Sequence, residues 1–346
     1  MSNTISLRPR GVTTINRTAE FVSPGHPDKI CDILSDYILD LYLAKDPHAR
    51  VAVEVMGGHG ELYVCGEISS KAKINIRQKL REKLGPDIKI HLNLVQQSPE
   101  IARGVDTGGA GDQGIMVGYA CAENSLLLPT EYVLARDLCQ KIYSSYPYDG
   151  KTQITVALSY DHERRLISSQ LKHIVLSWQN VSTKTLCGEL TIWLNNLPLP
   201  NITIADDLKV SVNPAGDWSC GGFDADTGLT GRKIVIDNYG PRVPVGGGAF
   251  SGKDPSKVDR SAAYMARKIA IDYLNKYHAQ EAYIYLAYAL GEAQPVDATA
   301  LIDGRSEAIR NYDLSPRAII QKLDLLKPNY SQRSTWGHHA YAYMLK

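Results

Sequence analysis

Glycine, lysine and aspartate gather in a stretch near the end of the chain that holds the residue types needed to bind a polyphosphate. Residues 246–260 read GGGAFSGKDPSKVDR. The glycines leave the backbone free to approach a ligand closely, and Lys253 and Lys257 supply positive charge. We expect Asp254 and Pro255 to begin a helix that continues to Tyr277. A flexible loop that opens onto a helix N-terminus, with lysine beside it, could hold phosphate oxygens.

This stretch is not an ordinary nucleotide-binding P-loop. Gly247 to Lys253 fits the spacing G-x-x-x-x-G-K, but Asp254 stands where a P-loop has Ser or Thr for magnesium. Residues 242–245 also predict a poor central strand, because Pro244 cannot donate to a sheet. A glycine-rich surface turn followed by a basic helix remains the alternative.

Three further segments repeat this chemistry. Each combines glycine or a tight turn with aspartate and, in most cases, a cation, as carboxylates for metal and cations for phosphate would require. They are residues 25–29 (GHPDK), 104–118 with Asp106 and Asp112, and 217–233 with Asp226, Arg232 and Lys233. Any one of them is more often a plain turn, but several in one chain favour a nucleotide site.

Helical and strand patterns alternate along the chain and predict an α+β or α/β architecture. We expect helices at residues 28–44, 71–84, 131–144, 184–194, 256–277 and 315–326. We expect strands at residues 50–56, 61–68, 88–95, 152–160, 173–178, 208–212, 234–236 and 281–290. Residues 1–18 read as a loose leader, and no internal sequence repeat is visible.

The first helix carries Asp28, Asp32, Asp36 and Asp40 at four-residue steps. We expect the last three to form a solvated face, because charged side chains are mostly exposed. Asp28 is different, since it follows His26 and precedes Lys29 at the helix start.

Composition limits the classes of function. The 346 residues are 44% hydrophobic and 22% charged, with a net charge of +1, which argues against a broad nucleic-acid-binding face. The longest apolar run, residues 282–290, is far shorter than a membrane helix needs. Six scattered cysteines without C-x-x-C spacing favour a reduced, cytoplasmic protein without a zinc site.

Four sequence blocks resemble those of the S-adenosylmethionine synthetase (methionine adenosyltransferase) family. They are GHPDKICDILSD, GAGDQGIMVGYA, DTGLTGRKIVIDNYG and GGGAFSGKDPSKVDRSAAY, and they occur in the family's order. Weaker similarity joins them from about Glu20 to about Gly337.

The resemblance implies three similar α+β domains around a pseudo-threefold axis, here expected at residues 14–105, 106–222 and 223–346. It implies a homodimer, or a dimer of dimers, with active sites between subunits. It also implies a reaction in which the methionine sulfur displaces triphosphate from ATP, followed by cleavage of the triphosphate. Two Mg²⁺ and one K⁺ per subunit would assist.

The resemblance assigns roles to individual residues by position. Catalysis would involve His26, Lys151, Asp226, Arg232, Lys253 and Lys257. ATP would be bound by His26, Asp112, Asp149, Lys151, Trp218, Asp226, Arg232, Lys233, Ala249 and Lys253, with Trp218 in place of the usual Phe. Methionine would be bound by Glu67, Gln97, Asp226 and Lys257. The Mg²⁺ ligands would be Asp28 and Asp259, and the K⁺ ligand Glu54.

The chain also departs from the family pattern. The gating loop, Ser98 to Gly109, is short, Pro24 replaces a usual Glu, and residues 296–316 and the C-terminus are shortened. Two alternatives share the fold: a non-catalytic regulatory subunit, and a triphosphatase that has lost methionine binding. The retained phosphate-handling and methionine-binding residues favour the synthetase.

Overall fold

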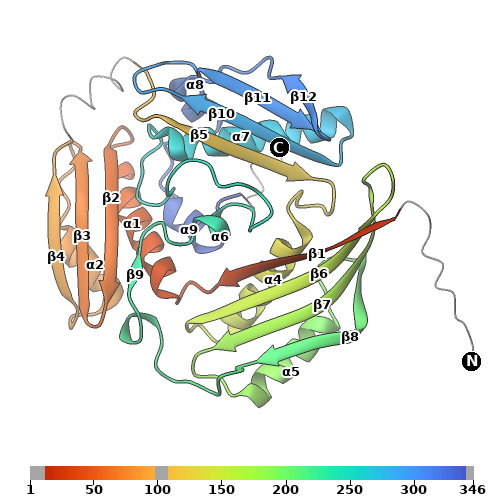
Figure 1. The fold of residues 1–346 in the computed structure, drawn as a ribbon. Coiled ribbons are helices and arrows are strands. Elements are labelled where there is room, and N and C mark those ends of the chain that lie inside the picture. Colours follow the sequence, from red (N-terminus) through yellow and green to blue (C-terminus); the bar gives the residue numbers. More distant parts are fainter. Residues whose placement is uncertain (1–11, 98–107, 340–346) are drawn as a thin grey trace, which may run out of the picture.

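A computed structural model describes residues 12–97 and 108–339 and shows an α+β protein built on three four-stranded sheets. The sheets and their helices surround the centre of the molecule, where the short helices α6 (Ile234–Asp237) and α9 (Tyr330–Thr335) lie (Figure 1). The predicted α+β class is confirmed. The part of the gating loop at residues 98–107 lies outside the described residues, as do residues 1–11 and 340–346.

The first sheet has the order β4-β3-β2-β9 and uses the long helix α1 as its cover. β2 and β3 form an antiparallel hairpin, and β4 adds in parallel. The bounds are α1 Pro27–Leu43, β2 Arg50–Gly58, β3 Glu61–Ser69, α2 Ile76–Leu84, β4 Lys89–Val95 and β9 Gly228–Leu229. The predicted hairpin at residues 50–68 is therefore confirmed.

The second sheet repeats this plan with the order β1-β6-β7-β8. Its hairpin β6-β7 is again followed by a helix and a parallel strand, β8. The bounds are β1 Thr13–Val22, α4 Thr130–Ser145, β6 Gly150–Tyr160, β7 Leu166–Trp178, α5 Thr183–Leu194 and β8 Ile202–Val212. The same order of elements recurs although the sequence shows no repeat.

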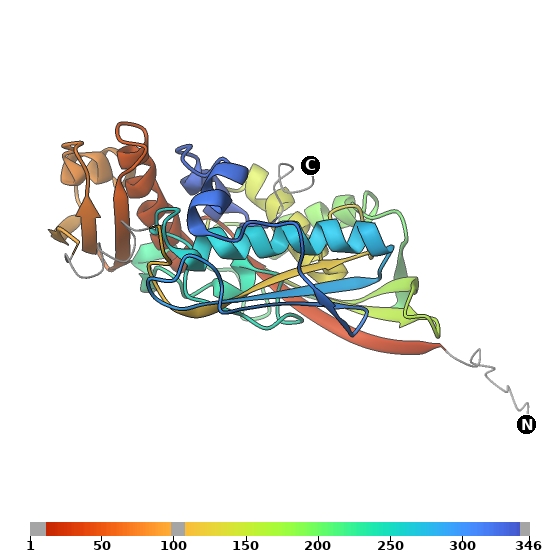
Figure 2. The same ribbon diagram turned by 90° about the horizontal axis from the view of Figure 1, so that it is seen from above.

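The third sheet has the order β12-β11-β10-β5, and all its pairs are antiparallel. The long helix α7 lies along it, as Figure 2 shows for the light-blue helix. The bounds are β5 Gly114–Cys121, α7 Val258–Tyr277, β10 Glu281–Tyr288, β11 Asp297–Ile302, β12 Arg305–Ala308 and α8 Pro316–Lys322. Each sheet thus takes one edge strand (β9, β1 or β5) from a distant part of the chain. The expected domain boundaries stay a prediction.

Several expected elements are wrong. Residues 13–18, taken as leader, belong to β1, which pairs with β6 over its whole length. Residues 234–236, taken as a strand, form the single helical turn α6. The helix expected at residue 71 begins at Ile76, because the Asn75 side chain accepts the Gln78 N–H as an N-cap.

The long C-terminal helix also begins later than expected. Its N-cap is Lys257, without a side-chain cap, and Asp254 and Pro255 lie before it. The Asp254 carboxylate instead accepts the N–H of Val51 at 2.7 Å and of Ser256 at 2.8 Å. Asp254 therefore ties the glycine-rich loop to β2.

The expected solvated face of α1 is wrong as well. Asp32 and Asp36 are completely buried, and Asp40 is half-buried. The helix is packed against β2, β9 and α9, so it has no fully solvated side on which a row of aspartates could lie. We call Asp28, Asp32, Asp36 and Asp40 the aspartate row.

Candidate active site

The N-terminus of α1 organises the candidate site around His26. His26 is the N-cap, and its Nδ1 accepts the Asp28 N–H at 3.2 Å, while Pro27 occupies the first helical position. Burial, followed by the positive charge of Lys233, lowers the pKa of His26 to about 4. The imidazole is therefore neutral at neutral pH. Because Nδ1 accepts, the proton sits on Nε2, for which the described residues provide no hydrogen-bond acceptor.

Asp28 connects this helix start to the glycine-rich loop at residues 217–233. Its carboxylate accepts the Leu229 N–H at 3.0 Å and the Lys233 Nζ at 2.6 Å, and Arg232 Nε lies 3.5 Å away. Burial raises the pKa of Asp28, but the hydrogen bonds from Lys233 and Leu229 outweigh it and lower the pKa. Asp28 is therefore ionised and draws two cations to the helix N-terminus.

Three more predicted residues lie near His26: Asp149 and Lys151 at the start of β6, and Asp226 in the loop before β9. Lys151 and Asp226 both act electrostatically on the His26 imidazole. Asp149 accepts the Gly222 N–H at 3.0 Å, and burial raises its pKa. Lys151 makes an ion pair with Glu20 of β1 at 3.5 Å.

The loop at residues 246–260 supplies a second pair of acid and base. Lys253 Nζ bonds the Asp259 carboxylate at 2.7 Å, and the same carboxylate accepts the Gly248 N–H at 2.7 Å. Lys257 Nζ bonds Asp254 at 2.6 Å. The two predicted magnesium ligands, Asp28 and Asp259, are thus each ion-paired with a predicted phosphate-binding lysine.

The two loops meet directly. A Cβ placed on Gly231 would lie 2.6 Å from the Cβ of Ala249, so the segments that carry Lys233 and Lys253 touch. The loops that carry Lys233 and Lys253 therefore lie side by side along α1, where their cations could bind one chain of phosphates.

Glu54 and Glu67 lie on one face of the first sheet. Glu54 is opposite Cys65 and Glu67 opposite Ala52 in the β2-β3 hairpin, so both point to the side away from α1. The backbone of Lys253 forms an isolated antiparallel β-bridge with Ala52 of β2. The positive charge of Lys253 favours the ionised form of the nearby Glu54 carboxyl.

Some predicted site residues lie apart from the group around His26, Asp28 and the two glycine-rich loops in this single chain. Among described residues, Glu67 makes no hydrogen bond or ion pair with it, and exposed Asp112 bonds only the N–H of Gln113. Gln97 follows β4, and its buried Oε1 has no partner within the described chain.

Trp218 lies on the turn that approaches Asp149. A Cβ on Gly221 would come within 2.8 Å of the Trp218 ring and 2.5 Å of Gln179 Oε1. The same Gln179 oxygen accepts the Asp149 N–H at 3.2 Å. Gln179 was not among the predicted site residues, and an isolated glutamine carries no sequence signal for such a role.

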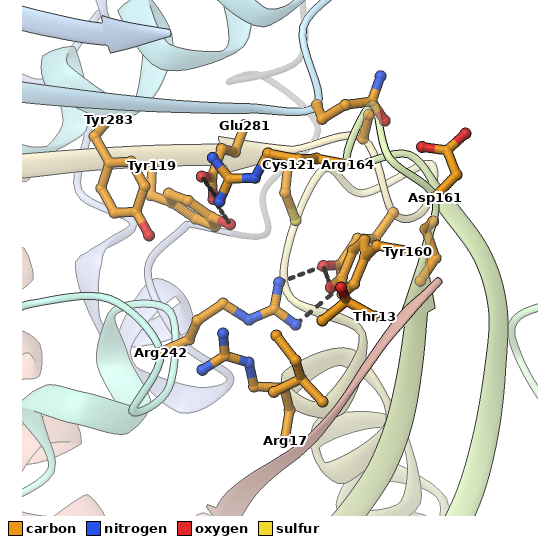
Figure 3. A pocket seen from close by; sticks show the side chains of 15 residues that line it. Thr13, Arg17, Tyr119, Cys121, Tyr160, Asp161, Arg164, Arg242, Glu281 and Tyr283 are labelled. Carbon is orange, nitrogen blue, oxygen red and sulfur yellow. Dashed lines mark hydrogen bonds and ion pairs between the residues drawn. The ribbon is translucent and has the colours of Figure 1, made fainter. Parts of the chain in front are cut away.

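A separate cavity of about 300 Å³ lies between the second and third sheets (Figure 3). Arg17 and Arg242 line it, and Arg242 pairs with Glu123 and with Glu131 at 2.6 Å. No residue of the predicted site lines this cavity. The paired charges join the segment after α6, the turn after β5 and the start of α4, and the cavity is not part of the site at α1.

A helix N-terminus with lysine and arginine beside it, as at α1, is an arrangement that binds anions such as phosphates. Sequence comparison is more specific. The N-terminal, central and C-terminal domain models of S-adenosylmethionine synthetase match residues 14–94, 107–218 and 220–344, respectively. The chain belongs to the S-adenosylmethionine synthetase family.

Named relatives agree with this assignment. The S-adenosylmethionine synthase of Salinibacter ruber is 40% identical over an alignment of 358 positions, gaps included, that covers 93% of this chain and 92% of the relative. The S-adenosylmethionine synthase of Nocardia farcinica is 39% identical, with the same coverage of both chains. That of Desulforudis audaxviator is 40% identical, again over 93% and 92%.

Proposed function

We propose that this protein synthesises S-adenosyl-L-methionine from ATP and L-methionine. The methionine sulfur forms a bond to the ribose C5′, and the C5′–O bond breaks with its electron pair leaving on the triphosphate. Water then cleaves the triphosphate to phosphate and pyrophosphate. The loops that carry Lys233 and Lys253 contact each other and both bond α1, and this arrangement in a member of this family is the observation that carries the proposal.

No general base is needed, because a thioether sulfur has no proton to lose. The chain's contribution is to position the reactants and to stabilise the departing negative charge. His26 suits this task, since its neutral ring can donate Nε2–H to an oxygen of the triphosphate. Lys151, Arg232, Lys233 and Lys253 would contact phosphate oxygens, and their ion pairs with carboxylates keep them in place before the substrate arrives.

The remaining assignments follow the family positions. Asp226 would hold the methionine amino group, and Lys257 its carboxylate. Asp149 and Trp218 would contact the nucleoside. Glu67, Gln97, Asp112 and Ala249 complete the proposed set, with Asp112 supplied across a subunit interface.

The family is metal-dependent, and the donor set here fits hard cations. The described residues contain no group of three or more His, Cys, Asp or Glu side chains that could form a complete metal cage. Mg²⁺ is ordinarily held by one or two carboxylates plus substrate phosphates, which Asp28 and Asp259 could provide. We propose two Mg²⁺ held there and one K⁺ at Glu54. The metals would neutralise phosphate charge when bound.

A homodimer, or a dimer of dimers, completes the proposal. The face of the first sheet that carries Glu54 and Glu67 also exposes several apolar side chains, and exposed apolar side chains of this kind favour association. They are Met56, Tyr63, Val95 and Leu229, between 37% and 55% exposed. No helix in the described part of the chain is long and apolar enough to cross a membrane. The six free cysteines support a cytoplasmic location.

The direct test is an assay of purified protein with ATP, L-methionine, Mg²⁺ and K⁺. We expect S-adenosylmethionine, phosphate and pyrophosphate in equal amounts, all lost when methionine or Mg²⁺ is omitted. A folded protein that binds ATP but forms none of these products would overturn the proposal. No observation in the described residues favours the non-catalytic alternative.

A further inference from the structure

The aspartate row on α1 joins one helix to three loops that are distant in sequence. Asp28 accepts the N–H of Leu229, and Asp32 accepts the N–H of Gly231 at 2.9 Å. Asp36 accepts the N–H of Gly252 at 2.8 Å. Asp40 accepts the N–H groups of Tyr330 and Ser331, at 2.8 and 2.9 Å. Carboxylates on successive turns of α1 thus accept backbone N–H groups from three segments that are far from α1 in sequence.

We propose that Asp32 and Asp36 are positioning residues for the triphosphate-binding cations. Asp32 holds the backbone just before Arg232 and Lys233, and Asp36 holds it just before Lys253. This inference rests on the proposed function, because it concerns the phosphate-binding role of those cations.

Asp32 is itself fixed in a buried ion network. Its second oxygen accepts Lys29 Nζ at 3.1 Å, and Lys29 also bonds Asp237 of α6. The side chains of Lys29 and Asp32 are fully buried, and that of Asp237 is 4% exposed. The carboxylate is therefore fixed between the Gly231 N–H and Lys29.

Asp36 fixes the second loop from two directions. Arg260 of α7 bonds both Asp36 oxygens, at 2.8 and 2.7 Å, and donates to the Lys253 carbonyl at 2.8 Å. The backbone on each side of Lys253 is therefore tied to α1, at the Gly252 N–H and at the Lys253 carbonyl. Gly252 also lies against Val53, and a Cβ there would come 2.0 Å from the Val53 carbonyl.

Stability alone is a weak reason for such a row. Replacing a buried ion pair by apolar residues of similar volume is often neutral or stabilising. What apolar residues cannot do is accept a backbone N–H and so fix a loop. A misplacement of about 1 Å at a reacting centre can lower a rate about a hundredfold.

Asp40 provides a matched control on the same helix. It has the same chemistry and accepts two backbone N–H groups, but its partners begin α9, which carries no predicted site residue. Asp32→Ala and Asp40→Ala therefore both remove a row member, but only the first releases a cation-bearing loop. Asp32→Asn keeps an oxygen that can accept the Gly231 N–H.

The test measures binding of inorganic tripolyphosphate with Mg²⁺, synthesis kinetics and the thermal midpoint for each variant. We expect Asp32→Ala to weaken tripolyphosphate binding about tenfold and to lower kcat about a hundredfold, with a smaller change in the KM for methionine. Asp32→Asn should recover most of this loss. Asp40→Ala should lower the thermal midpoint but leave tripolyphosphate binding and kcat within about twofold of wild type.

Asp36→Asn gives a second test if Asp32→Ala does not fold. Asparagine lacks the negative charge and the second oxygen that bond Arg260, and Arg260 in turn holds the Lys253 carbonyl, so tripolyphosphate binding should weaken by several-fold. Equal effects of the Asp32 or Asp36 variants and of Asp40→Ala on tripolyphosphate binding would overturn the inference. Wild-type protein that binds tripolyphosphate but makes no S-adenosylmethionine would overturn the proposed function alone, and failure to bind tripolyphosphate would overturn the positioning role.

Discussion

At the scale of single residues, the candidate site depends on charges that are already paired before any ligand binds. Asp28 holds Lys233, and Asp259 holds Lys253, at 2.6 and 2.7 Å. These pairs keep long, flexible lysine side chains near the places where phosphate oxygens would lie, so less side-chain entropy is lost on binding.

Lys253→Ala tests the phosphate assignment. We expect synthesis and the hydrolysis of added tripolyphosphate to fall together by about 10²-fold or more, because both need the same cation. Lys276→Ala, which changes an exposed lysine in the last turn of α7, is the control and should leave both rates unchanged. An unchanged tripolyphosphatase rate in Lys253→Ala would contradict the assignment.

His26→Asn separates the two roles of His26. Asparagine is a good N-cap, so the helix should keep its stability, while loss of the imidazole donor should lower kcat about 10²- to 10³-fold. His26→Ala should show the same loss of kcat and an additional loss of about 1 kcal/mol in the free energy of unfolding. A kcat within tenfold of wild type in His26→Asn would show that the imidazole makes no contact with the leaving group.

At the scale of elements, the aspartate row shows why local sequence patterns miss part of a fold. The four-residue spacing was visible, but the partners of Asp32 and Asp36 are backbone groups about 200 residues away. Nothing in α1 itself reveals them. The charge of Asp32 and Asp36 therefore predicted an exposed face, whereas their hydrogen bonds to distant loops keep them buried.

Short elements were missed for a different reason. Ile234–Asp237 is a single turn, and a run of three apolar residues fits a strand as well as a helix. β1 begins with polar residues and is held by β6, more than 130 positions away. The hairpin β2-β3 and the long helices were predicted because their periodic patterns are long and their contacts local.

Gly252→Ala tests how firmly the second loop is fixed. Gly252 has φ +81°, and a Cβ would lie 2.0 Å from the Val53 carbonyl, whereas Gly60 has φ +80° and open space around it. We expect Gly60→Ala to lose about 1 kcal/mol of unfolding free energy from backbone strain alone. Gly252→Ala should lose at least 2 kcal/mol more by urea denaturation. Equal losses would mean that the loop can move away from β2.

At the scale of the whole molecule, three sheets with helices packed on them bring distant segments to a common centre. Each sheet includes an edge strand from a distant part of the chain. The glycine-rich loops at residues 217–233 and 246–260 both donate backbone N–H groups to the aspartate row of α1. Glycine and charge composition alone indicated a polyphosphate site in these loops. Glu54, Glu67, Gln97, Asp149 and Lys151 were reached only by resemblance, because single polar residues on strands and their ends have no local pattern. Their roles stay predictions.

The exposed face of the first sheet leads to a prediction about assembly. Tyr63 is 40% exposed there, and burying an additional unpaired charge in the proposed interface would be strongly unfavourable. We expect Tyr63→Asp to shift the protein towards the monomer in analytical ultracentrifugation. Val296→Asp changes a side chain that is 65% exposed elsewhere and should leave the dimer intact. Identical masses for both variants and wild type would place the interface on another surface.

The most direct test of the central claim follows the oxygen that bridges the ribose C5′ and the α-phosphorus of ATP. With this oxygen labelled as ¹⁸O, attack by sulfur at C5′ must leave the label with the triphosphate. We predict one labelled oxygen in the phosphate plus pyrophosphate formed per S-adenosylmethionine, and none in the nucleoside product. Label that stays on the nucleoside would show cleavage of a P–O bond instead, and would contradict the proposed reaction.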